Sequence, residues 1–155
     1  MTKYALLISL YISISSLIVS LSALNLNSSE TLHWAVLVAG SNSYSNYRHQ
    51  ADICHSYKIL IGNGMNPDRI ITLLYDDIAY NTQNPFQGQI FNKPDATGDG
   101  VDVYKNCKID YKGNDVSPQT FLDVLNGKEI SYGSKKTLKS SSLDNIFVYY
   151  SGIEV

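Results

Sequence analysis

The sequence is poor in cysteine: Cys54 and Cys107 are the only two among its 155 residues. In an oxidising compartment they could pair. Cys54 also fits the apolar side of a predicted helix, where a cysteine packs as a small apolar side chain. Neither cysteine follows the carboxyl end of a buried strand, so neither is expected to be a nucleophile.

An excess of positive charge is also absent, since 12 basic and 14 acidic side chains leave a net charge of −2. Such a chain is not expected to bind nucleic acid. No cofactor is expected either. The sequence lacks a glycine-rich phosphate loop, which weakens the alternative of a flavodoxin-like ligand-binding domain.

Histidine is scarce, with three in the chain. His49, Cys54 and His55 are close in sequence, but residues five or six apart on a helix point to different faces. No second pair of ligands occurs elsewhere, and the spacing does not match the usual metal sites. No metal centre is therefore expected.

The amino-terminal segment has no charge from residue 5 to 24 and follows a single lysine, Lys3. This pattern and the small residues Ser20-Leu21-Ser22 predict a signal peptide over residues 1–23, with a short linker over 24–32. An uncleaved anchor is the alternative, because the run nearly reaches a membrane-spanning length. The serines within the run lower its hydrophobicity and so favour a cleaved signal peptide. The glycosylation sequon at Asn27 agrees with secretion. We expect a chain of the secretory pathway without stable membrane insertion.

The chain is organised around residues 33–57. The continuous apolar run 34–39 predicts a strand buried on both faces, as in a parallel sheet. From Gln50 on, helical spacing predicts one apolar stripe, in a helix that ends near the C-cap signal Gly62-Asn63-Gly64. That stripe consists of Ile53, Tyr57, Leu60 and Ile61. The polar loop 41–49 between strand and helix should lie at the carboxyl edge of the sheet, where open α/β folds bind ligands.

The polar loop holds more than a turn requires. Gly40, Asn42 and Ser43 suffice for a solvated turn, which is the alternative interpretation. Arg48 stands at the helix entry, where the helix dipole favours anions rather than cations. An arginine in a position unfavourable for stability is a candidate for binding a carboxylate or a carboxamide oxygen.

The remaining elements complete a layered α/β pattern. A strand over residues 70–74 makes a right-handed βαβ unit with the first strand, and the adjacent Asp76 and Asp77 are interpreted as turn formers. Ser117 as N-cap and Pro118 at the first position predict a helix that ends at residues 126–127. Residues 146–150 predict a third buried strand.

The stretch from 78 to 115 lacks a clean period and predicts a long ordered loop that could include a hairpin. Within it, residues 95–102 partly match a calcium-binding loop. Thr97 at the third position and Asn106 at the twelfth depart from that pattern, which favours a solvated acidic turn.

The chain from His33 to Tyr150 resembles the legumain (asparaginyl endopeptidase) family of cysteine proteases. The most specific match is Asn46-Tyr47-Arg48-His49-Gln50-Ala51-Asp52. Further matches are residues 38–42, 54–55, 75–80, 84–85, 110–113, 116–119 and 121–122. The resemblance implies a caspase-like three-layer α/β sandwich with a mostly parallel sheet. Residues 33–151 would be its amino-terminal part, followed by a divergent tail over 152–155.

The resemblance also implies roles for three residues. Asn46 would orient the catalytic histidine, while Arg48 and His49 would help to form the pocket for a substrate asparagine. Because the asparagine amide is neutral, such a pocket must offer donors and acceptors, and Arg48 supplies donors. The implied partners are proteins or peptides that contain asparagine, in a lysosome or vacuole or after secretion.

The end of the chain departs from the family pattern. The family's catalytic histidine follows the third strand in an Asp-His-Gly motif, and its cysteine follows a later strand. Here Tyr149-Tyr150-Ser151 match the approach, but residues 152–155 do not contain that histidine. We therefore expect a truncated chain that is inactive by itself and leaves one sheet edge open. The alternative is a non-catalytic secreted fragment that binds peptides or regulates, retaining Arg48 and His49.

Overall fold

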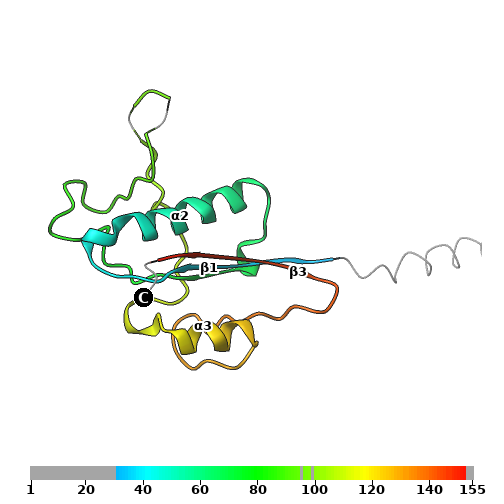
Figure 1. Ribbon diagram of the computed structural model, residues 1–155. Coiled ribbons are helices and arrows are strands. Elements are labelled where there is room, and N and C mark those ends of the chain that lie inside the picture. Colours follow the sequence, from blue (N-terminus) through cyan, green and yellow to red (C-terminus); the bar gives the residue numbers. More distant parts are fainter. Residues whose placement is uncertain (1–30, 95, 99, 153–155) are drawn as a thin grey trace, which may run out of the picture. The chain divides into compact units, whose positions relative to one another are not determined.

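The computed structural model describes residues 31–94, 96–98 and 100–152 (Figure 1). From Leu32 on, they belong to one compact unit. The predicted signal peptide, its sequon, most of the linker and residues 153–155 of the tail lie outside the described residues. Among the residues that are described, no helix is both long enough and apolar enough to cross a membrane.

A three-stranded parallel sheet forms the middle layer. Its strands are β1 (His33–Ala39), β2 (Ile70–Leu73) and β3 (Asn145–Ser151), in the order β2-β1-β3. In register, Val36 of β1 lies beside Ile71 of β2 and Val148 of β3. The three predicted strands are confirmed, with β2 one residue shorter and β3 one residue longer at each end than expected.

Helices cover the two faces of this sheet, α2 (Tyr47–Gly62) on one side and α3 (Pro118–Leu125) on the other (Figure 1). Ala35, Leu37 and Ala39 of β1 pack in the cluster beneath α2. The alternating residues Trp34, Val36 and Val38 pack in the cluster with Val124 of α3. The three layers confirm the predicted α/β class.

Helix α2 begins earlier than the sequence predicted. We expected the helix from Gln50, but it starts at Tyr47, directly after a 3-10 turn over Tyr44–Asn46. Tyr47 packs against the core beneath α2, so it adds another residue to the apolar side. Arg48 and His49 therefore lie in the first helical turn rather than in a loop. The predicted end is confirmed, because Asn63 caps the helix and Gly64 has a φ of +84°.

Helix α3 begins and ends as predicted. The Ser117 side chain accepts a hydrogen bond from the Thr120 amide, and Pro118 occupies the first helical position. This pairing satisfies one of the free amides of the first turn. Asn126 caps the other end, and Gly127 follows with a φ of +67°.

Strand β3 is exposed, and the prediction that it is buried was wrong. Ile146, Phe147, Val148 and Tyr150 are 44–52% exposed. Within the described part of the chain β3 pairs only with β1, so it forms the edge of the sheet. An apolar run has the same sequence pattern whether it is central or at an edge. The expectation of an open sheet edge agrees with this arrangement.

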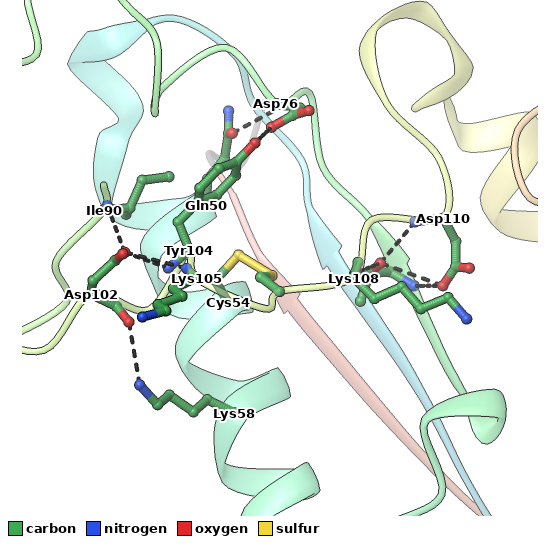
Figure 2. Close-up of a disulfide and its surroundings, with 12 residues drawn as sticks. Gln50, Cys54, Lys58, Asp76, Ile90, Asp102, Tyr104, Lys105, Lys108 and Asp110 are labelled. Carbon is green, nitrogen blue, oxygen red and sulfur yellow. Dashed lines mark hydrogen bonds between the residues drawn. A yellow bond between two sulfur atoms is a disulfide. The ribbon is translucent and has the colours of Figure 1, made fainter. Parts of the chain in front are cut away.

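The long segment between β2 and α3 is irregular, as predicted, and it is fastened to α2 by a disulfide (Figure 2). Cys54 and Cys107, 53 residues apart, form this bond, so pairing is the correct one of the two alternatives. In place of a hairpin, the described residues contain a single antiparallel bridge between Phe91 and Asp102.

The partial calcium-loop match lies mostly at a surface turn, and its Asp95 and Asp99 are outside the described residues. Asp102 has another function. Its Oδ1 accepts hydrogen bonds from the amides of Ile90, Tyr104 and Lys105, at 3.2, 3.0 and 3.4 Å (Figure 2). This carboxylate stabilises the bend that leads to the disulfide.

We predict that replacing Cys54 and Cys107 together by alanine lowers the free energy of unfolding by roughly 2–4 kcal/mol, because the crosslink restricts the unfolded chain. Urea denaturation measures the change. Reduced parent protein is the matched control and should lose a similar amount. A thiol assay that finds two reactive cysteines in the untreated native protein would contradict the disulfide.

Candidate functional site

The loop after β1 lies at the carboxyl edge of the sheet, beside the end of β3. The Gly40 amide donates to the Ser151 carbonyl oxygen at 2.9 Å, which joins the two strand ends. Gly40 has no space for a side chain, because a Cβ there would overlap the Tyr150 hydroxyl group. The loop therefore leaves β1 tightly and turns toward α2.

Asn46 and Arg48 lie on the exposed side of this turn. The Asn46 Nδ2 donates to the Asn42 carbonyl oxygen at 2.9 Å, which fixes the amide plane. Among the described residues, nothing donates to its Oδ1. The Arg48 Nη1 is 3.4 Å from the Ser45 carbonyl oxygen, and no described carboxylate forms an ion pair with this guanidinium. Both groups retain capacity to bind another molecule.

His49 is buried, with 4% of its surface exposed. Its Nδ1 shares a 2.5 Å hydrogen bond with the Ser41 hydroxyl. Burial, and then the positive charge of Arg48, lower the pKa of His49 below 6.5. The ring is therefore neutral at neutral pH. The three residues singled out from the sequence, Asn46, Arg48 and His49, are thus gathered at the start of α2.

A buried polar brace holds the loop in place. Gln50, 1% exposed, donates from Nε2 to Asp77 Oδ1 at 2.7 Å and accepts the Asp76 amide at 3.1 Å. Asp77 Oδ2 in turn accepts the amide of Ser43 at 2.7 Å. Ser43 has a φ of +71°, which non-glycine residues rarely adopt, so this hydrogen bond supports a strained corner.

The brace extends to the segment that carries the disulfide. The Tyr104 hydroxyl donates to Asp76 Oδ1 at 2.9 Å, as Figure 2 shows. Burial and then the Asp76 carboxylate raise the pKa of Tyr104, so the hydroxyl stays protonated and continues to donate. The interpretation of Asp76 and Asp77 as turn formers is confirmed, since Asp76 has a φ of +64° at the corner after β2.

A pocket of about 460 Å³ opens at the same edge, on the α3 side of the sheet. It is lined by the end of β1, Ser41, Asn42, the start of α3 and Tyr150, without a charged side chain. Arg48 and His49 are not among its lining residues. The pocket and the start of α2 therefore share only the loop between them.

Sequence reasoning did not identify two of the contacts that shape this site. Ser41 was seen only as one of many polar loop residues, although it binds His49. Asp77 was linked to its own turn, although it binds Ser43 and Gln50 from other elements. No group of three potential metal ligands occurs among the described residues.

Comparison with known proteins identifies one family along almost the whole described part of the chain. Residues 33–152 match the sequence model of the peptidase C13 family. The chain is similar to the hemoglobinase of Schistosoma japonicum (53% identity over 117 residues, 76% of this chain and 26% of the relative). It is also similar to the legumain of Rattus norvegicus (50% identity, 76% and 27%) and to the vacuolar-processing enzyme delta-isozyme of Arabidopsis thaliana (51%, 79% and 26%). The chain thus spans about a quarter of the length of these relatives.

Removing the Asp77 carboxylate should loosen the loop. We expect Asp77→Ala to speed hydrogen exchange of the Ser43 amide and to lower the free energy of unfolding by about 1–3 kcal/mol, because the buried Gln50 side chain and the Ser43 amide lose their acceptor. Exchange monitored by NMR and urea denaturation measure both effects. The control is Asp68→Ala, which removes a carboxylate that is 81% exposed. Equal exchange at Ser43 in both variants would contradict the brace.

The lowered pKa of His49 predicts a pH-dependent stability. Below about pH 6.5 the unfolded chain binds a proton that the folded ring resists, so stability falls as the pH decreases through that value toward the folded pKa. Urea denaturation between pH 7.5 and 5 should show a smaller loss for His49→Gln than for the parent. An unchanged pH dependence in this variant would show that His49 does not contribute.

Proposed function

Because the chain belongs to the peptidase C13 family, we propose that residues 33–152 act as the amino-terminal part of a legumain-like cysteine endopeptidase domain that cleaves polypeptides after asparagine. The gathering of Asn46, Arg48 and His49 in a single turn at the ligand-binding edge of the sheet is the observation that carries this proposal. The printed names of the relatives agree with a peptidase, and the choice of asparagine rests on the resemblance.

In the proposed site, Arg48 donates hydrogen bonds to the side-chain oxygen of a substrate asparagine, since its guanidinium carries five donors and has no carboxylate partner among the described residues. His49 lies next to it on α2. Asn46 orients the imidazole of a catalytic histidine. Its Nδ2 donates to the Asn42 carbonyl oxygen, and its Oδ1 can accept a hydrogen bond from an imidazole N–H.

The nucleophile of the proposed reaction is not one of these 155 residues. A cysteine peptidase attacks with a thiolate, and both cysteines of this chain are joined in the disulfide. The 155-residue chain alone is therefore proposed to be inactive as a peptidase. In the complete reaction, the thiolate and its histidine come from other residues of the peptidase domain.

Binding of asparagine-containing peptides without cleavage is the second candidate function. The specific observation in its favour is that Arg48 is exposed and has no carboxylate partner among the described residues, while both cysteines are joined in the disulfide. A disulfide also agrees with an oxidising compartment. We propose the secretory pathway, with the vacuole or lysosome as destination.

A chimera tests the peptidase proposal. Residues 33–151 of this chain would replace the matching segment of the rat legumain, and cleavage of peptides after asparagine would be measured. We expect activity, and a loss of at least about tenfold in kcat/KM for Arg48→Gln, because hydrogen bonds to a charged group contribute about 1.5–3 kcal/mol. Lys58→Gln removes another exposed cation of α2 and should leave the activity unchanged.

The isolated 155-residue chain is the second arm of this experiment. We expect it to leave the same peptides intact, while binding without cleavage would support the second candidate function. Cleavage by the isolated chain that is lost in Asn46→Ala would contradict its proposed inactivity. Equal activity of the Arg48→Gln and parent chimeras would contradict the assigned substrate contact.

A further inference from the structure

The pair formed by Ser41 and His49 has a feature that the proposed function does not use. The Nδ1 of His49 is occupied by the Ser41 hydroxyl at 2.5 Å. The other ring nitrogen, Nε2, has no hydrogen-bond partner among the described residues. Nε2 is not one of the fully buried side-chain atoms that lack a hydrogen-bond partner, so part of it remains exposed to solvent. The state of Nε2 therefore decides what the ring offers to a ligand.

A neutral imidazole carries its proton on one nitrogen, and the hydrogen bond of one nitrogen selects the state of the other. A serine hydroxyl can donate or accept. Among the described residues, Nδ1 of His49 is the one hydrogen-bond partner of the Ser41 hydroxyl. The hydroxyl proton therefore finds a protein acceptor only when Nδ1 is unprotonated, which favours Ser41 as the donor and leaves the ring proton on Nε2.

We infer that Ser41 is a positioning residue, which holds His49 as the Nε2–H tautomer, so that Arg48 and His49 both act as hydrogen-bond donors. Arg48 and His49 then both recognise an oxygen acceptor, such as the side-chain carbonyl oxygen of asparagine. This role for Ser41 rests on the proposed function. If Ser41 accepted instead, Nε2 would be an acceptor and would bind the amide NH2 of asparagine rather than its oxygen.

NMR of the 155-residue chain with 15N-labelled histidine tests the inference at neutral pH. Protonated and unprotonated ring nitrogens have well-separated 15N frequencies, and the chain has only three histidines. His33→Gln and His55→Gln assign the signals. We expect His49 in the parent to have a protonated Nε2 and an unprotonated Nδ1. Ser41→Ala should shift both nitrogens toward a mixture of tautomers.

Two control variants separate this role from a general effect on folding. Ser41→Thr keeps a hydroxyl and should retain the parent tautomer. Ser45→Ala removes a serine of the same turn that bonds to Ser43 rather than to His49, and should change nothing. A protonated Nδ1 in the parent overturns the inference, as do identical His49 signals in the parent and Ser41→Ala. If Ser41→Ala fails to fold, the parent and Ser41→Thr still decide the tautomer.

Peptide binding then links the tautomer to recognition. The ratio of affinities for a blocked asparagine peptide and its leucine counterpart should fall about twofold in Ser41→Ala, because only half of the molecules would present Nε2–H. An unchanged ratio in that variant overturns the role in recognition. Absence of any asparagine preference in the parent overturns the proposed substrate contact instead, and the 15N measurement still decides the tautomer.

Discussion

Burial of β1 on both faces is the constraint from which the remaining architecture follows. All its residues from Trp34 to Ala39 are buried, with alternate side chains in the two core clusters. A strand of this kind needs helices on both sides of the sheet. Helix α2 must therefore begin close to the end of β1, and the short connection between them has to lie at the carboxyl edge. The position of Asn46, Arg48 and His49 is a consequence of this geometry.

The irregular segment after β2 contributes to the same edge through a few strong attachments. The disulfide fastens it to the middle of α2, and the Tyr104 hydroxyl reaches Asp76. From Asp76 the contacts continue through Gln50 and Asp77 to the backbone of Ser43. A long loop has few regular hydrogen bonds of its own, so these contacts both order the segment and hold the corner of the site.

The sequence predicted the features that depend on local pattern. The strands, both caps of α3 and the end of α2 follow from apolar runs and from the residues 117–118, 63–64 and 126–127, whose preferences act within a few positions. The exposure of β3 was not predictable in this way, because it depends on which strand occupies the edge. The early start of α2 escaped because polar residues at its first turn have the composition of a loop.

The site residues likewise divide into those that a local sequence pattern predicts and those whose contacts depend on the fold. Arg48 could be selected from the sequence, since its conflict with the helix dipole is a local feature. The contact between Ser41 and His49 joins residues eight positions apart across a corner set by Ser43 and a carboxylate from another strand end. Its geometry depends on the left-handed φ of Ser43, which side-chain preferences do not predict. Contacts made across such corners are visible only in three dimensions.

Two donors, Arg48 and His49, limit what this part of the site can distinguish. Arginine donors bind a carboxylate at least as strongly as a carboxamide, so Arg48 and His49 alone do not select asparagine over aspartate. Asp52, the acidic residue of α2, accepts hydrogen bonds from Asn92 and Ser151 at its two oxygens, and these contacts hold it to neighbouring segments. In the proposed function, choice of the neutral side chain needs an acceptor that Arg48 and His49 do not provide, whereas this pair binds the side-chain oxygen.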